Sequence, residues 1–132
     1  MTRDPGTRRR VLVSGATTGI GRATASRLAA DGWQVLAGVR RLADAPEAAD
    51  GAAGSIQPAP ARRHRPRVGR PRGHGGGGAT GSSPLTAVVN NAGVGLIAPM
   101  QSVELTALQA VWDVNVVGVV RLTQARVPLL AH

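Results

Sequence analysis

The chain has 132 residues, enough for one domain and no more, and it has no Cys, which excludes disulfides, zinc–thiolate sites and thiol nucleophiles. All 16 of its basic residues are Arg and it has no Tyr, so neither Tyr nor Lys serves in catalysis within these residues. The net charge of +9 would favour nucleic acid as a partner, but six of the Arg residues lie between positions 62 and 72, and without them the excess of Arg over acids is +3, from 10 Arg and 7 acids.

Residues 1–10 lack the apolar core of a signal peptide. We also find no apolar run of membrane-spanning length. We therefore expect a cytoplasmic chain that has no membrane partner.

The first predicted elements are a short strand, a glycine-rich turn and a helix. Val11–Val13 is an apolar run, the turn spans Ser14–Gly21, and the predicted helix covers Arg22–Ala30. Gly32 is available for a left-handed cap at the end of this helix, and a second apolar run, Trp33–Val39, follows. The order strand, helix, strand predicts a βαβ unit with parallel strands and a right-handed crossover.

The turn between strand and helix is suited to binding an anion. Gly15, Gly19 and Gly21 let the backbone bend sharply and approach a ligand closely. The helix that follows presents unpaired N–H groups and the positive end of its dipole, which suit the diphosphate of a dinucleotide. A glycine-rich turn without any ligand is the alternative, but the flanking strand and helix favour the binding site.

Arg40 follows the second predicted strand directly, where the adenosine ribose lies in folds of this kind. An acidic residue there would favour NAD, whereas an Arg can pair with a 2′-phosphate. Arg41 adds to the positive charge. We therefore predict NADP rather than NAD as the cofactor, the alternative being that Arg40 is a solvated surface residue.

The middle of the chain differs in composition from both flanks. Ser55-Ile56 can supply part of a further strand, whereas Pro58–Pro84 is rich in Pro, Gly and Arg and has no apolar periodicity. Such a segment buries too little surface to offset its ordering entropy, so we predict disorder over residues 58–84. Its Arg residues raise the alternative of a nucleic-acid-binding protein, which the lack of interleaved aromatic residues disfavours.

The C-terminal flank, residues 85–132, begins with a buried-strand pattern at Leu85–Val89 and continues into Asn90-Asn-Ala-Gly93. Helical periodicity then runs from Ser102 to Ala131, and Pro128 should kink or end the helix. Asn115 lies within an otherwise apolar stretch, and a buried amide is costly unless it is paired. Two interpretations stay open for Asn115, a backbone-bonded side chain and an active-site group.

Taken together, these segments resemble the short-chain dehydrogenase/reductase family over residues 10–56 and 85–132. Ser14–Gly21 is similar to the family's TGxxxGIG with Ser in place of the usual Thr, Asn90–Gly93 to its NNAG, and Asp113–Asn115 to the helix with its catalytic Asn. Residues 90–130 look like the retinol- and steroid-type reductases of the family. The resemblance implies an α/β fold with a Rossmann-type doubly wound parallel sheet, NAD(P) binding, and hydride transfer between the nicotinamide and a small-molecule carbonyl or alcohol.

The resemblance also implies roles for individual residues. The diphosphate and the nearby ribose would be held by Gly15, Thr17, Thr18, Gly19, Ile20 and Gly21. Arg40 would meet the adenosine phosphate, and the cofactor would be lined by Asn91, Ala92 and Gly93. Asn115 would belong to the catalytic residues, where it holds a water in the proton relay.

The chain departs from the family pattern in two places. The family's Ser and Tyr-x-x-x-Lys have no counterpart within residues 1–132, so we expect the fragment to be inactive by itself. The tract 58–84 replaces the family's third strand region at nearly equal length, and reading Arg62–Val68 one nucleotide later permits a family-like sequence. We therefore hypothesise that two compensating frameshifts flank this tract.

The expected architecture is thus one incomplete three-layer αβα domain over residues 1–132. Its fourth strand should have an open edge, which predicts marginal stability. A nucleotide-binding module without catalysis is the alternative function. The sequence predicts neither the substrate nor the oligomeric state.

Overall fold

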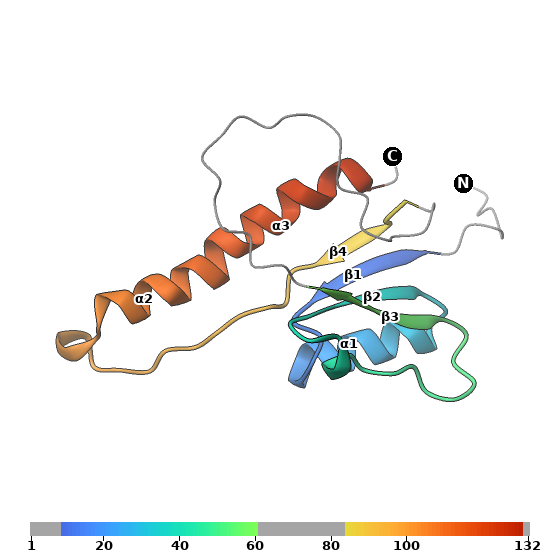
Figure 1. Cartoon of the computed structure of the whole chain (residues 1–132), viewed down its shortest axis with the longest axis horizontal. Coiled ribbons are helices and arrows are strands. Elements are labelled where there is room, and N and C mark those ends of the chain that lie inside the picture. Colours follow the sequence, from blue (N-terminus) through green and yellow to red (C-terminus); the bar gives the residue numbers. More distant parts are fainter. Residues whose placement is uncertain (1–8, 61–83, 131–132) are drawn as a thin grey trace.

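The computed structural model describes residues 9–60 and 84–130, and these form a parallel sheet with helices on both faces (Figure 1). The strands are β1 (Arg10–Ser14), β2 (Gln34–Val39), β3 (Ser55–Pro60) and β4 (Ala87–Val89), in the spatial order β3-β2-β1-β4. All pairs are parallel, with Leu12 opposite Leu36 on one side and Val88 on the other. The expected α/β class, the central place of the first strand and the βαβ unit are confirmed.

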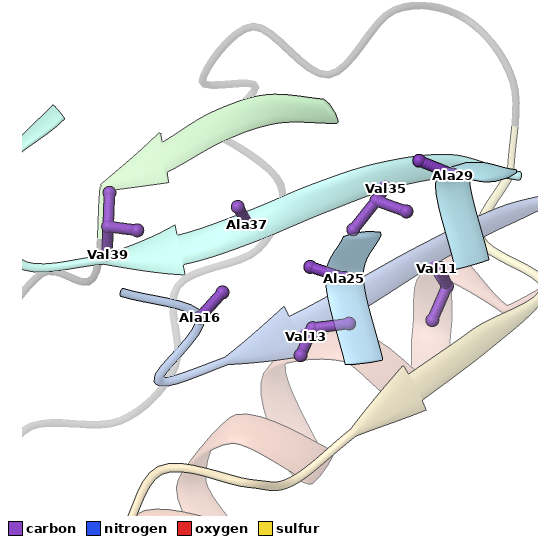
Figure 2. Packing of buried hydrophobic residues seen from close by; sticks show 8 residues of the cluster. All are labelled: Val11, Val13, Ala16, Ala25, Ala29, Val35, Ala37 and Val39. Atoms are coloured by element: carbon purple, nitrogen blue, oxygen red, sulfur yellow. The ribbon is translucent and has the colours of Figure 1, made fainter. Parts of the chain in front are cut away.

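Helix α1 (Gly19–Ala30) covers one face of the sheet. Its Ala25 and Ala29 are fully buried against alternate residues of β1 and β2 (Figure 2). Alanine suits this position because a side chain of one methyl lets the helix approach the sheet closely. The core cluster on this face consists of Val11, Val13, Ala16, Ala25, Ala29, Val35, Ala37 and Val39.

The end of α1 has the predicted glycine cap. Gly32 has φ of 85°, and its N–H donates to the carbonyl of Ala29. The N–H of Trp33 donates to the carbonyl of Leu28. This pair of bonds satisfies carbonyls of the last turn and directs the chain back into β2.

Strand β3 corrects the predicted boundary of the disordered tract. It runs through Pro58, Ala59 and Pro60, which pair with Ala37, Gly38 and Val39 of β2. Proline is tolerated here because β3 is an edge strand, where an N–H facing away from β2 is not needed. Ser55-Ile56 begins this strand, as predicted, but composition could not reveal its continuation through Pro58–Pro60, since that part is ordered by backbone pairing with β2. The remainder of the tract, residues 61–83, lies outside the described part of the chain.

The second face of the sheet is covered by one long helical segment, which starts at Leu105 rather than at the predicted Ser102. It comprises α2 (Leu105–Trp112), a π-helical segment η3 (Asp113–Val117), α3 (Gly118–Arg126) and a 3₁₀ turn η4 (Val127–Leu129). Ser102 instead belongs to the 3₁₀ turn η2 (Met100–Ser102), where its hydroxyl and its N–H both donate to the carbonyl of Pro99. A Ser side chain used in this way competes with helix formation.

The contact between this helical segment and the sheet is confined to its C-terminal half. Leu122 and Leu130 pack against Leu12, Leu36 and Leu85. No residue of α2 belongs to either core cluster among the described residues, and in Figure 1 α2 extends beyond the sheet. Successive residues of β1 and β2 point to opposite faces of the sheet, which is why each face has its own cluster of apolar side chains.

The helix Leu105–Leu129 also corrects our statement about membrane-spanning length. Its 25 residues are long and apolar enough, by length and composition, to cross a membrane, and it is the one such helix in the described part of the chain. Core helices of soluble proteins pass the same test, so the finding is weak evidence for a membrane segment.

Candidate functional site

The candidate site lies where β1 crosses into α1, at the carboxyl ends of the parallel strands. Gly15 has φ of 66° and Gly19 has φ of 54°, a backbone region that L residues with side chains rarely adopt. Each of these glycines therefore meets the conformational need that the sequence indicated. The turn is closed from the β2 side by a hydrogen bond from the N–H of Ala16 to the carbonyl of Gly38, 3.2 Å long.

Two of the glycines are also required by close packing. A Cβ added to Gly15 would lie 2.8 Å from the Cα of Ala92. A Cβ added to Gly21 would overlap both the carbonyl oxygen of Gly15 and the Nδ2 of Asn91. Gly15 and Gly21 therefore bring β1, α1 and the segment after β4 into direct backbone contact.

Gly19 is different, because a Cβ built on it meets nothing within 4 Å. Ile20 beside it is 79% exposed. Thr18 precedes α1 in an extended conformation, and its side chain makes no bond to the helix amides. Because the first turn of α1 also holds no acidic residue, no described side chain neutralises the positive end of this helix.

The side chain of Asn91 forms hydrogen bonds to the backbone of the crossover between β1 and α1. Its Nδ2 donates to the carbonyls of Ser14 and Gly15, at 3.0 and 3.2 Å, and its side chain is half-buried. It thus fixes the position of the glycine turn, while Ala92 and Gly93 next to it are exposed. That these three residues line a cofactor, as the NNAG resemblance implies, stays a prediction.

Ser14 holds the candidate site together, a role that the sequence analysis did not assign to it when it noted Ser in place of the usual Thr of the motif. Its Oγ accepts hydrogen bonds from the N–H groups of Asn91 and Ala92, at 2.9 and 3.0 Å, and donates to the carbonyl of Val89. One hydroxyl therefore joins the carboxyl ends of β1 and β4. A Ser directly before a glycine turn at the end of a buried strand was the available signal.

Gly38 is a second residue that the analysis missed. A Cβ there would lie 3.0 Å from the carbonyl oxygen of Val13 and 3.1 Å from the Cα of Ser14. A glycine inside an apolar strand is a sign of such a close backbone approach. Gly38 thereby lets the crossover lie close over the end of β2.

Asn115 is exposed, so the expectation of a buried amide was wrong. Its Nδ2 donates to the carbonyl of Val94, at 2.8 Å, and its Oδ1 accepts from the N–H of Val94, at 2.9 Å. Asn115 therefore avoids the free-energy cost of burying an amide. It lies in the π-helical segment η3, beside the loop that follows Gly93 and away from the core of the sheet. The backbone-bonded interpretation therefore describes its side chain, which lies 3.4 Å from a Cβ built on Gly93.

The two arginines after β2 are in different electrostatic situations. Arg41 donates to the carboxylate of Asp44 at 2.9 Å, and this hydrogen bond, together with the charge of Asp44, raises the pKa of Arg41, which stays charged. Arg41 therefore does not reinforce a phosphate site in the way its position suggested. Arg40 is exposed and forms no ion pair with a described residue, so its charge is available to a ligand.

The described residues offer no metal site, because they contain no group of three or more metal-ligating side chains. The open first turn of α1, the glycines and Arg40 are instead suited to a phosphate-containing ligand. The His residues at 64, 74 and 132 lie outside the described part of the chain.

Comparison with known proteins gives consistent matches. The family model of short chain dehydrogenases matches residues 9–59. Serine 3-dehydrogenase of Rhizobium radiobacter is 33% identical over 128 residues, covering 91% of this chain and 48% of the relative. Bovine retinol dehydrogenase 8 is 51% identical over 41 residues, which is 31% of this chain and 13% of that protein.

The fold has a counterpart among solved structures. A short-chain dehydrogenase from Streptomyces avermitilis superposes with a TM-score of 0.68 and 20% identity, covering 93% of this chain and 44% of that one. The chain thus spans about half the length of the relatives it matches along most of its own length.

Proposed function

Because the chain belongs to the short-chain dehydrogenase/reductase family, we propose that its crossover binds the diphosphate of a nicotinamide dinucleotide. The observation that supports this proposal most directly is the uncapped first turn of α1. A Cβ built on Gly19 would meet nothing within 4 Å, the side chain of Thr18 makes no capping bond to the helix amides, and the first turn holds no acidic residue. Asn91 donates to the carbonyl of Gly15, and the close packing at Gly15 and Gly21 leaves no room for a side chain between α1, β1 and the segment after β4.

The protein to which these residues belong is proposed to transfer hydride between the nicotinamide and a small-molecule carbonyl or alcohol. The dinucleotide would supply the hydride chemistry. Thr17, Thr18 and Ile20 would contact it beside the glycines, and Ala92 and Gly93 leave room for it after β4. Residues 1–132 contain no Tyr or Lys, so by themselves they are proposed to bind nucleotide without turning it over.

Asn115 is proposed to serve as a positioning residue for the catalytic step. Its paired amide holds the Val94 backbone, and through it the loop that follows Gly93. In the relatives' full-length fold this would order the segment that lines the nicotinamide end of the site.

The test of the proposed function is calorimetric titration of the 132-residue chain with NADPH and NADH. We expect saturable binding. Ile20→Glu should weaken it at least about tenfold, because a carboxylate beside the helix amides repels a diphosphate. Ser26→Glu adds the same charge to the exposed face of the same helix and serves as the control. Absence of saturable binding of either nucleotide by the folded chain would contradict the proposal.

For the choice of cofactor we propose NADP, selected by Arg40. Arg40→Ala should weaken NADPH binding about tenfold and leave NADH binding within about twofold, because only NADPH has the 2′-phosphate that a guanidinium can grip. Arg27→Ala, at the far end of α1 in an exposed pair with Asp31, is the matched loss of one positive charge. Equal losses for both nucleotides in Arg40→Ala would show that Arg40 does not select.

A further inference from the structure

The same four residues, Ala-Ala-Asp-Gly, occur twice in the chain, at positions 29–32 and 48–51. An Asp followed by Gly is able to cyclise, because the backbone nitrogen of a residue without a Cβ can approach the side-chain carboxyl carbon unhindered. Asp31 and Asp50 are both exposed, so neither local sequence nor exposure distinguishes the two pairs. The structure distinguishes them by the bonds that each glycine N–H and each carboxylate makes.

The first pair is held at the end of α1. The N–H of Gly32 donates to the carbonyl of Ala29, at 3.0 Å. Both carboxylate oxygens of Asp31 accept from the Nε of Arg27, at 3.0 and 3.3 Å. Closing a five-membered ring requires rotation about the Cα–C bond of Asp31 from its ψ of 13°, and this rotation would break the bond of Gly32. The end of the helix therefore opposes cyclisation at Asp31.

The second pair, Asp50-Gly51, forms the centre of an exposed turn. The N–H of Ala52 donates to the carbonyl of Ala49, at 3.0 Å, and Gly51 has φ of 76°, as in a type II turn. Among the described residues, neither the N–H of Gly51 nor the carboxylate of Asp50 has a hydrogen-bond or ion-pair partner. A Cβ built on Gly51 would meet nothing within 4 Å. Rotation at Asp50 therefore opposes only the single bond of this turn.

The turn lies in the loop that leads from β2 into β3, between two anchored positions (Figure 1). Before it, Ala48 packs against the core cluster under α1. After it, the N–H of Gly54 donates to the carbonyl of Ala29, at 2.9 Å. The backbone of residues 49–52 can therefore change its dihedral angles while the residues on both sides stay in place.

We propose that Asp50-Gly51 is a site of spontaneous isoaspartyl formation, whereas the fold protects Asp31-Gly32. The nitrogen of Gly51 attacks the Cγ of Asp50, and as the N–Cγ bond forms, the hydroxyl of the protonated carboxyl group leaves with the N–H proton as water. Water then opens the cyclic succinimide. Addition at Cγ restores Asp, whereas addition at the former peptide carbonyl breaks its C–N bond and directs the main chain through Cβ and Cγ.

The isoaspartyl product has one more methylene in the main chain, ahead of β3, and a free carboxylate on the α carbon. The water lost in ring closure is regained in ring opening, so no oxidant or reductant is consumed. The free α-carboxylate is the chemical group to which a methyltransferase that uses S-adenosylmethionine can add a methyl group. This inference concerns the loop before β3 and does not depend on nucleotide binding.

The test is prolonged incubation of the full 132-residue chain at near-neutral pH, followed by cleavage with trypsin. A purified isoaspartyl methyltransferase and radiolabelled S-adenosylmethionine then report the isoaspartate in each peptide. Cleavage after Arg separates the two pairs, because Asp31 lies in residues 28–40 and Asp50 in residues 42–62. We expect isoaspartate to form at least about tenfold faster in the peptide with Asp50, since cyclisation at Asp31 requires local opening of the helix end.

The unfolded chain is the internal control. In guanidinium chloride the two identical Ala-Ala-Asp-Gly segments should form isoaspartate at rates within about threefold of each other, because the bonds at the end of α1 are lost. Equal rates in the folded chain, or a faster reaction at Asp31, would overturn the inference. So would a difference of the same size in the unfolded chain, because the fold would then not be its cause.

Two matched variants test the role of the glycine N–H. Asp50→Asn should form isoaspartate faster than the unmodified chain, because ammonia is lost more readily from an amide than water from a carboxyl group. Asp31→Asn removes the ion pair with Arg27 but keeps the bond from Gly32 to Ala29, so it should react at least about tenfold more slowly than Asp50→Asn. Equal rates in the two variants would show that this bond does not protect the first pair.

Asp50→Glu is the negative control for the assignment. It keeps the negative charge, but cyclisation would need a six-membered ring, so label in residues 42–62 should be lost. Label that persists in this peptide would place the reaction at another residue and overturn the assignment to Asp50.

Discussion

Replacing Gly21 by Ala is expected to lower the free energy of unfolding by about 3 kcal/mol and to abolish nucleotide binding. The added Cβ would overlap the carbonyl oxygen of Gly15, which is backbone and cannot rotate away, and the Nδ2 of Asn91. The preference of a helix for Ala over Gly, about 1 kcal/mol, is smaller than the cost of moving α1 away from β1. The measurements are urea unfolding followed by circular dichroism, and titration with NADPH.

Gly95→Ala is the matched control for this substitution. A Cβ at Gly95 meets nothing within 4 Å, so the same chemical change should alter the unfolding free energy by less than about 0.5 kcal/mol. If Gly21→Ala were as stable as Gly95→Ala and bound NADPH normally, the tight contact between α1, Gly15 and Asn91 could not be what shapes the site.

Replacing Ser14 by Ala should cost about 2 kcal/mol of unfolding free energy. The hydroxyl serves two N–H donors and one carbonyl acceptor, and it links β4 to β1 at the edge of the candidate site. Water can replace the bond to Ala92, which is exposed, but less readily the bonds to Asn91 and Val89, which are half-buried. This partial replacement is why the expected loss is smaller than three full hydrogen bonds.

The conservative variant Ser14→Thr keeps the hydroxyl and matches the residue usual in the family's motif. It should unfold within about 0.5 kcal/mol of the unmodified chain. Hydrogen exchange provides a local measurement, since the amides of Asn91 and Ala92 should exchange faster in Ser14→Ala but not in Ser14→Thr. Unchanged exchange at both amides in Ser14→Ala would show that the hydroxyl does not hold this junction.

Much of the crossover could be predicted because its requirements are local. The glycines at 15 and 19 have positive φ, and Gly32 ends α1 with the predicted cap. These conformations depend on neighbours along the chain, so the residue types reveal them. The parallel arrangement of β1 and β2 likewise follows from the βαβ order.

Other features depended on partners distant in the sequence. Ser14 and Asn91 are 77 residues apart, and although a Ser before the glycine turn is a signal, the sequence does not indicate which amides its hydroxyl receives. The sequence predicts that Arg41 adds its charge to that of Arg40, but in the structure Arg41 forms an ion pair with Asp44. The apolar neighbours of Asn115 in the sequence predict that it is buried, but Val114 and Val116 beside it are themselves exposed.

The amino-acid sequence thus determined the type of fold and the backbone shape of the crossover, because strand periodicity, glycine conformation and helix capping act within a few residues. Only the tertiary structure decided that Pro58–Pro60 join the sheet, that Asn91 and Ser14 bond the crossover to the end of β4, and that the helix Leu105–Leu129 leaves many of its apolar side chains exposed. The physical reason is that strand pairing and side-chain burial depend on which segments of the chain meet in space. At the junction of β1 and β4, the surfaces that meet are contributed by segments more than 70 residues apart.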